Sequence, residues 1–522
     1  MKKAISFALT LALGLSLLAG CGGGGKENSS AGTPNNGGSS VSEPAGSTGP
    51  KEIRVALESD IAALDPRNAN STMTAGVMSH IFSKLVSTDA QMNAVPDLAE
   101  SWEQVDELTW RFHLRKDVTF HDGSPFTSAD VVYTLDSIAA DNTWRLYTDF
   151  SFMKATAVDE YTVDISTEDP YPGLLLRLNY VHIIPQAYTE SVGNEAFAKA
   201  PVGTGPYKFV EWAKDEYVVI EAYDGYFGGK PSIDKITFSI IPETASRIAA
   251  LEAGEIMFAA GIPSVEKDRL AGLGTINVVD YPTSRIFFLN FNQLVEGPLQ
   301  DIRVRQAICH AIDRDMLING VLDGYAVKVA SLSCPEYDGY DASIEGPAYD
   351  PELSKQLLAD AGYAGGLTLD ASYSQSNANA SDVMQFVAAQ LEKVGIKVNL
   401  IEMDSAQQRD MISAGTVAPL YLNGIGGPYA NIDLLAKLCY STGERYSTYS
   451  NPEFDALRQK AATTVDQAER DALNAQLQQW IVDEAAGLSL YQPSAIYAYS
   501  SKLTGWEPRA DEMKLFFNCD LA

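Results

Sequence analysis

Hydrophobic and polar residues are arranged along this chain in patterns that predict strands and helices in turn. Between Leu108 and Leu114 every second residue is apolar, which predicts a strand with one buried face. Thr127 and Asp130 precede apolar residues at helical spacing. We therefore expect Thr127 to cap a helix whose first turn carries Asp130, a favourable place for a negative charge.

Glycines mark the ends of several predicted helices, and the pattern is more regular from residue 285 onward. Gly254, Gly362, Gly395 and Gly415 each follow a segment of helical periodicity, and glycine commonly ends a helix. Strands and helices alternate through short links, which indicates the α/β class with a mainly parallel sheet. Strands are predicted at 53–57, 217–222, 236–241, 285–292, 367–373, 397–402 and 419–422, and helices at 243–253, 304–318, 351–361, 382–394, 406–414, 452–464 and 467–484.

The N-terminus has the arrangement of an export signal. Two lysines precede an apolar stretch, 4–20, that is short for a membrane span. The sequence LAGC, which ends at Cys21, resembles the lipobox of bacterial lipoproteins, in which the cysteine is lipidated and becomes the first mature residue. We therefore expect a lipoprotein signal peptide at 1–20. The alternative is an ordinary cleaved signal in which the cysteine is incidental.

Composition separates a tether from the folded part of the chain. Residues 26–50 are almost entirely Gly, Ser, Asn, Pro, Ala, Thr, Lys and Glu, and such a stretch buries too little apolar area to order itself. We expect 21–50 to be a disordered tether and folding to begin near Lys51. The whole chain has 522 residues, 46% of them hydrophobic, which is enough for more than one domain.

The charge of the chain limits its partners. The formal net charge is −30, and it becomes −32 once the two lysines of the signal are removed (−30 − 2). So acidic a surface repels nucleic acid and the anionic face of a membrane. We therefore expect no nucleic-acid partner, and attachment to the membrane only through the lipid.

Motifs of known enzymes are missing from the sequence. Neither HExxH nor GxSxG occurs, and segment 20–26 fits the start of a phosphate-binding loop only until Glu27 replaces the required Ser or Thr. The glycine-rich segment 201–207 leads into a strand and is interpreted as a rigid turn. A metal site built from distant histidines is the alternative. We expect a binding protein that is not an enzyme, with no catalytic residue, cofactor or metal.

Four cysteines remain besides Cys21, and none of them has CxxC spacing. Disulfides are possible in an exported protein, but four cysteines allow three pairings and the sequence does not choose among them. Cys309 lies in a segment with helical apolar periodicity, so it is expected to be a buried thiol. The four are Cys309, Cys334, Cys439 and Cys519.

Seven blocks of sequence follow one another in a characteristic order. They are LDP at 64–66, VPDLAESW at 95–102, TWRFHLRKDVTFHDGSPFTSADVVYTL at 109–135, PVGTGPYKFVEW at 201–212, RIAALEAGEI at 247–256, FFLNFN with DIRVRQAICHAIDRDMLI at 287–318, and YDPELSKQLLADAGY at 349–363. Together they resemble the family 5 extracellular solute-binding proteins, lipoproteins that serve ABC importers of peptides, oligopeptides and nickel. The resemblance spans residues 53–506.

The resemblance implies an architecture and a function. The implied fold is α/β, a two-lobed type II periplasmic-binding fold with an extra domain inserted in the first lobe. The implied function is that of a monomeric receptor at the outer side of the cell membrane. It would capture a peptide or peptide-like solute by lobe closure and deliver it to the permease subunits of an ABC importer. The boundaries implied are 51–88, 201–284 and 490–522 for the first lobe, 89–200 for the extra domain and 285–489 for the second lobe, with a hinge near 281–287 and 488–493.

The resemblance also points to a ligand-binding loop. Peptide-binding members usually carry a tryptophan and then an aspartate after a second-lobe strand, and the aspartate pairs with the ligand's ammonium. Here Gly424 and Gly427 stand at those positions, where glycine would let a ligand approach the main chain. Asp433 is an alternative partner, although its place before Leu434 suggests a helix start. The expected ligand contacts are Tyr373, Gln375, Asn377, Tyr421, Asn423, Gly427 and Tyr429.

Three alternatives stay open at this point. The two glycines also fit a non-peptide solute on the same scaffold, such as a sugar or a nickel chelate. A tethered hydrolase would need a nucleophile or a metal that no motif supplies. A sensor that binds the same solute without transport has the same sequence pattern.

Overall fold

The computed structural model describes residues 49–69, 71–375, 377, 379–426 and 431–522. Within it, Pro50–Ala522 form one compact unit. The export signal, Cys21 and most of the tether lie outside the described residues, as do Gly427 and Tyr429. Among the helices that the structure describes, none is long and apolar enough to span a bilayer.

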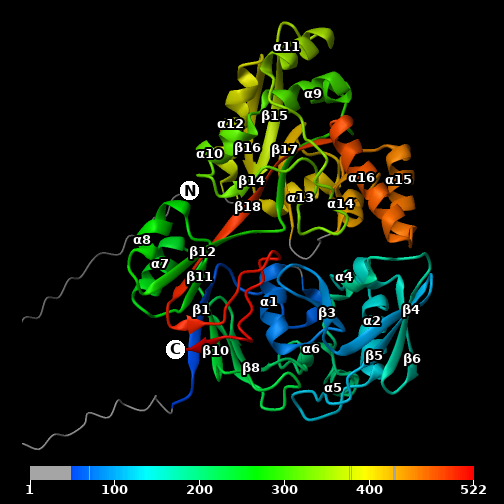
Figure 1. Ribbon diagram of the computed structural model, residues 1–522, viewed down its shortest axis with the longest axis vertical. Coiled ribbons are helices and arrows are strands. Elements are labelled where there is room, and N and C mark those ends of the chain that lie inside the picture. The colour runs from blue at the N-terminus through cyan, green and yellow to red at the C-terminus, as the bar shows by residue number, and fades with distance from the viewer. Residues whose placement is uncertain (1–48, 70, 376, 378, 427–430) are drawn as a thin grey trace, which may run out of the picture. The chain divides into compact units, whose positions relative to one another are not determined.

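A twelve-stranded sheet organises the compact unit (Figure 1). Ten strands follow in the order β16-β15-β17-β13-β18-β11-β1-β10-β9-β8, and β12 and β14 pair with β18 off this path. We call the part with β1 and β8–β12 the first half, and the part with β13 and β15–β17 the second half. The bounds are β1 Glu52–Leu57, β8 Tyr207–Ala213, β9 Tyr217–Ala222, β10 Lys235–Ile240, β11 Phe258–Ala260, β12 Ile276–Pro282, β13 Ile286–Phe291, β14 Ala326–Val327, β15 Leu367–Ser374, β16 Ile396–Met403, β17 Leu420–Ile425 and β18 Gly487–Ser500.

Strand β18 runs through both halves. Its residues 487–491 pair with β13, and its residues 494–500 pair with β12. At the crossing, Gln492 Nε2 donates to the backbone oxygen of Thr283 at 2.7 Å, and the backbone N–H of Thr283 donates to the Pro493 oxygen at 3.0 Å. The segment between β12 and β13 therefore crosses from one half to the other beside β18.

Strand β13 is buried on both of its faces. Phe287 and Leu289 pack in a cluster with α9 and α12, whereas Ile286 and Phe288 pack in another with α14, α15 and α16. A strand covered by helices on both sides must be apolar at every position. The helices of this half are α9 Ile302–Ala311, α10 Arg314–Gly320, α11 Pro351–Asp360, α12 Ala380–Glu392, α13 Ser405–Ser413, α14 Ile432–Tyr440, α15 Pro452–Thr463 and α16 Gln467–Asp483.

In the first half, β1 divides its side chains between two clusters in the same way. Ile53, Val55 and Leu57 pack with α1 and with aromatic residues near the C-terminus, whereas Ala56 packs with α7 and α8. This half too is a sheet covered on both faces. Its remaining elements are α1 Thr72–Ile81, α7 Thr244–Glu252, α8 Lys267–Ala271, β19 Leu503–Thr504 and β20 Asp520–Leu521.

The chain between α1 and β8 contains a separate antiparallel sheet. Its four strands follow in the order β4-β5-β7-β6. Helix α2 packs against it and begins after Thr127, whose backbone N–H donates to the Asp130 carboxylate at 2.9 Å. As predicted, Thr127 is the N-cap residue of this helix and Asp130 lies in its first turn. The bounds are β2 Val86–Thr88, β3 Ala94–Pro96, β4 Ala99–Asp106, β5 Thr109–Leu114, β6 Met153–Asp159, β7 Thr162–Thr167, α2 Ser128–Ala139, α3 Tyr147–Phe150, α4 Leu174–Leu178, α5 Gln186–Val192 and α6 Asn194–Phe197.

The structure differs from the sequence prediction in two places. The large sheet is not mainly parallel: β1 runs parallel to β10 and β11, and β15 to β16 and β17, but the described pairings of β13 and β18 are antiparallel. The single helix predicted at 304–318 is divided into α9 and α10. Ile312 is extended, and the Asp313 carboxylate accepts the backbone N–H of Met316 at 2.9 Å, which starts a new helix.

The glycine-rich segment 201–207 packs directly against the end of α1. The backbone N–H of Gly205 donates to the Ile81 oxygen at 2.9 Å, and a Cβ added at Gly203 would lie 2.1 Å from that same oxygen. His121 also bonds to the turn, with Nε2 3.0 Å from the Gly205 oxygen. These contacts agree with the interpretation of the segment as a rigid turn.

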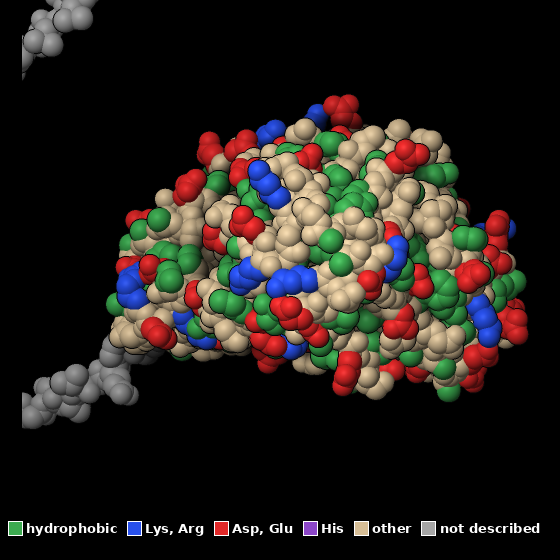
Figure 2. All heavy atoms as spheres, turned by 90° about the horizontal axis from the view of Figure 1, so that it is seen from above, with side chains coloured by type: hydrophobic (Ala, Val, Ile, Leu, Met, Phe, Trp, Pro, Cys, Tyr) green, Lys and Arg blue, Asp and Glu red, His purple; other side chains and the backbone are tan. Residues whose placement is uncertain are grey.

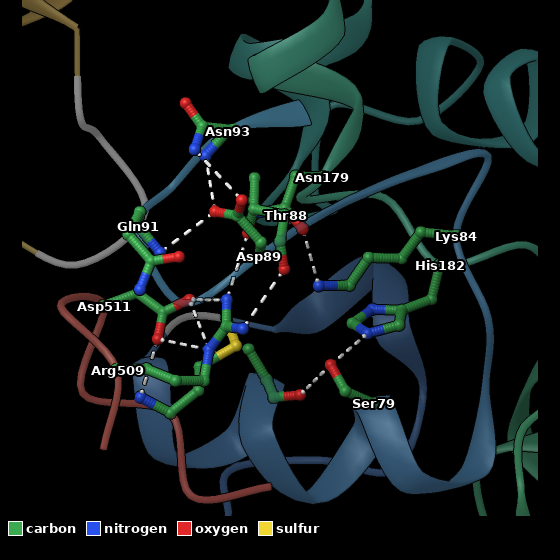
Figure 3. A network of polar contacts seen from close by, with 12 residues as sticks. Ser79, Lys84, Thr88, Asp89, Gln91, Asn93, Asn179, His182, Arg509 and Asp511 are labelled. Carbon is green, nitrogen blue, oxygen red and sulfur yellow. Dashed lines mark hydrogen bonds and ion pairs between the residues drawn. The ribbon is translucent and has the colours of Figure 1, made fainter. Parts of the chain in front are cut away.

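A buried polar network ties the β2 strand to the C-terminal segment and to the region of the antiparallel sheet (Figure 3). Arg509 pairs with Asp511 at 2.6 Å and donates to the Thr88 backbone oxygen at 3.1 Å. Lys84 is buried and donates from Nζ to Asn179 Oδ1 at 2.9 Å. Burial lowers the pKa of Lys84 to about 8, because the charged form loses its hydration.

Candidate ligand-binding site

Three cavities that share lining residues lie between the two halves. Their volumes are about 690, 260 and 600 Å³, and Arg285 lines all three. Glu58 comes from the first half, and Arg409 and Tyr446 come from the second half. We call this space the cleft. A solute within it touches both halves beside the crossing through β18, and its size suits a small molecule.

The strand ends of the second half place polar groups in the cleft. Strands β15 and β17 run parallel, so the residues that follow them lie at the same edge of the sheet. Ser374 and Asn377 come at the end of β15 and just after it, and Asn423 lies near the end of β17. Arg409 is on α13, which follows the parallel strand β16. Ligands of open α/β sheets bind at such carboxyl ends.

The predicted ligand contacts fall in different environments. Asn377 and Asn423 line the cavity of about 260 Å³, and Asn377 also lines that of about 600 Å³. Gln375 is exposed at the end of β15 and is not among the lining residues. Gly427 and Tyr429 lie outside the described residues. The two asparagines are therefore the predicted residues that the structure brings together at the cleft.

Two of the three predicted tyrosines, Tyr373 and Tyr421, point into the protein interior. Tyr421 is fully buried, and its hydroxyl accepts from Asn290 Nδ2 at 3.0 Å and lies 2.9 Å from Thr448 Oγ1. Burial raises the pKa of Tyr421. Tyr373 is also buried and donates to a carboxylate oxygen of Glu402 at 3.1 Å. Their hydroxyls are therefore engaged within the second half.

Two glycines of the predicted ligand loop have a packing role. A Cβ at Gly424 would lie 2.6 Å from the ring of Phe287, which is itself stacked on Tyr491 at a centroid distance of 5.1 Å. A Cβ at Gly426 would lie 2.4 Å from the Cα of Arg285. Arg285 of the segment that crosses between the halves, and Phe287 of β13 just after it, thus lie against these glycines. This close packing of the chain is sufficient to explain why glycine occupies both positions, and no contact with a ligand is needed.

Asp433, the alternative partner for a ligand ammonium, belongs to the start of α14. Asn431 caps this helix by accepting the backbone N–H of Leu434 at 3.1 Å, and Asp433 lies in the first turn. Burial raises the pKa of Asp433 to about 6, although Arg458, at 3.6 Å, acts in the opposite direction. Asp433 lines a small pocket that includes Tyr171, outside the cleft.

Two ion pairs hold charged side chains in the cleft. Arg285 Nε lies 3.0 Å from Glu512, and Lys514 Nζ lies 3.0 Å from Glu58. Burial alone would raise the pKa of Glu58, but Lys514, a backbone hydrogen bond and Arg247 together outweigh it and the pKa is lowered. Glu512 has φ of 62°, a left-handed conformation that is uncommon outside glycine and is found at functional sites.

The sequence analysis missed the basic residues of the cleft. Arg145, Arg285, Arg409, Arg445 and Lys514 line it, although acidic side chains are spread over the face of the protein seen in Figure 2. Arg285 begins the predicted strand 285–292 and Arg409 lies in the predicted helix 406–414, but neither position shows that the two side chains share a cavity. Among the described residues, no three His, Cys, Asp or Glu side chains gather as metal ligands.

Comparisons with known proteins agree with this architecture. The sequence pattern of bacterial extracellular solute-binding proteins, family 5 (Middle), matches residues 93–447. The glutathione-binding protein GsiB of Pectobacterium atrosepticum is 31% identical over 488 residues, which cover 90% of this chain and 94% of that protein.

Two solved structures show the same fold. The ABC transporter substrate-binding protein CtaP of Listeria monocytogenes has a TM-score of 0.83 at 26% identity, over 90% of this chain and 99% of that one. DppA of Helicobacter pylori, solved with the peptide STSA, has a TM-score of 0.78 at 26% identity, over 90% and 98%. The predicted α/β fold of type II periplasmic-binding proteins is confirmed. The chain belongs to the bacterial extracellular solute-binding proteins of family 5, the solute-binding components of ABC importers.

Proposed function

We propose that this chain captures a peptide or peptide-like solute in the cleft and delivers it to the permease subunits of an ABC importer. The observation that carries the proposal is the cleft itself, which is lined from both halves on either side of the β18 crossing. The name of its relative, a glutathione-binding protein, and the peptide in the DppA structure support a peptide-like ligand. No covalent change of the solute is part of this function.

Binding would act through closure of the two halves. A ligand shifts a conformational equilibrium only when it binds one state better than the other. A solute between Glu58 on one side and Asn377 and Asn423 on the other gains its full contacts only when the halves are close. We propose the first lobe at 51–88, 201–284 and 490–522, the extra domain at 89–200, and the second lobe at 285–489.

We further propose that the receptor works as a monomer on the outer face of the cell membrane, held there by a lipid on Cys21. The export signal and the LAGC sequence support this anchoring. A tether of about thirty residues (21–50) would let the folded part reach a membrane-embedded permease. Mass spectrometry of the N-terminal peptide from membranes should find an acylated Cys21. A protein recovered only in soluble form with an unmodified Cys21 would contradict the proposed anchoring.

A non-peptide solute is the second candidate. It is supported by Gly424, which stands where peptide-binding relatives usually have the tryptophan and which packs against Phe287. The same receptor role would then apply to a sugar or a metal chelate.

One experiment separates these functions. The solute that co-purifies with the native protein is identified by native mass spectrometry, and small-angle X-ray scattering is recorded with and without it. We expect a peptide-like mass and a smaller radius of gyration with the solute bound. An unchanged scattering curve at saturation would contradict the closure mechanism, and a sugar or chelate would favour the second candidate.

A further inference from the structure

We infer that the cleft selects acidic solutes, namely peptides or peptide-like molecules with at least two carboxylates, and that Arg409 and Arg445 bind those carboxylates. This inference rests on the proposed function and narrows its ligand. It concerns charge recognition within the cleft, which neither the family nor the relatives' names assign to these residues.

The charge of the cleft differs from that of the chain. The protein has 38 basic and 68 acidic residues, so an average cavity would be lined mainly by carboxylates. The largest cavity of the cleft instead has more basic than acidic side chains. It is lined by Arg145, Arg285, Arg409, Arg445 and Lys514, against Glu58, Asp149 and Glu512.

The acidic side chains of this cavity are already neutralised by basic ones. Glu58 pairs with Lys514 at 3.0 Å and Glu512 pairs with Arg285 at 3.0 Å. Asp149 pairs with the buried Arg177. The cavity's carboxylates are therefore not available to neutralise its other cations, Arg145, Arg409 and Arg445.

Within the described part of the chain, no acidic side chain neutralises Arg409 or Arg445. Their guanidinium groups form no ion pair or hydrogen bond with the residues that the structure describes, and Arg445 lies over the ring of Tyr446 at 4.9 Å from its centroid. Stacking on a tyrosine face orients a guanidinium while it leaves the N–H donors at its edge free. A guanidinium offers two parallel N–H groups to a carboxylate, which makes it the side chain best suited to bind one.

Among the described residues, the unpaired cations of this cavity come from two different parts of the protein. Arg145 precedes α3 in the region of the extra sheet, whereas Arg409 and Arg445 belong to the second half. Closure of an empty cleft brings these like charges together, which is unfavourable. A solute with two carboxylates removes that repulsion and gains contacts on both sides. An acidic solute would therefore bind the closed state better than a neutral one, which is the condition for ligand-driven closure.

The test compares two matched tripeptides, Ala-Glu-Gly and Ala-Gln-Gly, which differ by one carboxylate. Binding to the full chain is measured by isothermal titration calorimetry at low and high salt. The variants are Arg409→Gln, Arg445→Gln and the double variant, with Arg409→Lys to retain the charge. Arg54→Gln is the matched control, because Arg54 is an exposed arginine of β1 that does not line the cleft. Thermal unfolding verifies that each variant is folded.

We expect Ala-Glu-Gly to bind at least tenfold more tightly than Ala-Gln-Gly, and this preference to shrink at high salt. Each Arg→Gln change should weaken binding of the acidic peptide about tenfold or more and have little effect on binding of the neutral peptide. Arg409→Lys should retain part of the affinity for the acidic peptide. Arg54→Gln should change neither.

Scattering separates failure of this inference from failure of the proposed function. Equal binding and equal compaction by both peptides, unaffected by the arginine changes, would overturn the acidic preference and leave the receptor function intact. Binding of neither peptide, together with a co-purified solute that lacks carboxylates, would overturn the acidic preference. Absence of compaction with that co-purified solute would overturn the proposed function as well.

Discussion

Met92, at the tip of the β2–β3 hairpin, is buried in the same apolar cluster as Phe288 of the second half. The β2–β3 hairpin therefore reaches from the region of the extra sheet into an apolar cluster of the second half. Its turn is held by Asp89, whose carboxylate accepts the backbone N–H groups of Gln91 and Asn93 at 2.9 Å (Figure 3). Met92 has φ of 70°, so the turn keeps a strained residue in order to place this side chain.

The first prediction concerns this contact. Met92→Ala should lower the free energy of unfolding by about 2 to 4 kcal/mol, because it leaves a cavity in a packed cluster. Chemical denaturation monitored by circular dichroism measures the change. Met316→Ala is the control, since Met316 is 54% exposed, and it should cost less than about 0.5 kcal/mol. Equal effects of the two changes would show that Met92 does not anchor the hairpin.

The second prediction concerns the turn at 201–207. Gly203→Ala should destabilise the protein by about 3 kcal/mol, because its Cβ would overlap a backbone oxygen that cannot move aside. Gly365→Ala is the matched control: nothing lies within 4 Å of its Cβ, so the change should be close to neutral. The midpoint of thermal unfolding is the measurement. A Gly203→Ala protein as stable as Gly365→Ala would contradict the packing described for this turn.

The sequence predicted local structure better than it predicted the site. Periodicity and glycine located α11, α12 and α13, because Gly362, Gly395 and Gly415 take the left-handed conformation that ends a helix. Periodicity continued through residue 312, so the break before Asp313 was missed, since a buried apolar residue looks the same in a helix and in an extended link.

Burial explains what could be predicted at the cleft. Asn377 comes just after β15 and Asn423 lies near the end of β17, and the tendency of ligands to bind at the carboxyl ends of parallel strands is enough to place both. Tyr421 lies at the start of β17 in the structure, and its hydroxyl turns inward to Asn290, a partner 131 positions away that no local pattern indicates. The shared cavity of Arg285, Arg409 and Arg445 likewise depends on how the halves meet, which no local pattern contains.

The third prediction concerns the cysteines. Cys309, Cys334, Cys439 and Cys519 are all buried and free, so the possible disulfides of the sequence analysis are not formed. Burial raises the pKa of Cys309 and Cys519 to about 12, which removes the reactive thiolate. In the native protein, fewer than one of these four thiols per molecule should therefore react with Ellman's reagent within minutes. All four should react in guanidinium, and a count below four after unfolding would indicate a disulfide instead.

The last prediction concerns acid stability. His80 is fully buried among aromatic rings of Tyr207, Phe238, Phe516 and Phe517. Burial lowers its pKa from 6.5 to about 4. Because the folded pKa lies below the unfolded one, the unfolded state binds the proton more readily. The stability that His80 supports is complete above about pH 6.5 and is lost as pH falls towards 4, by roughly 3 kcal/mol.

Asp97 and Asp433 act in the opposite direction, because burial raises the pKa of each to about 6 and the folded state takes up their protons first. The His80 contribution must therefore be isolated. Histidine ring protons followed by NMR from pH 7 to 4 should show one resonance, absent in His80→Asn, that does not titrate above pH about 5. The unfolding free energy of His80→Asn should fall less steeply than that of the parent between pH 6.5 and 4. A resonance with its midpoint near 6.5 would mean that the proton reaches His80 in the folded protein.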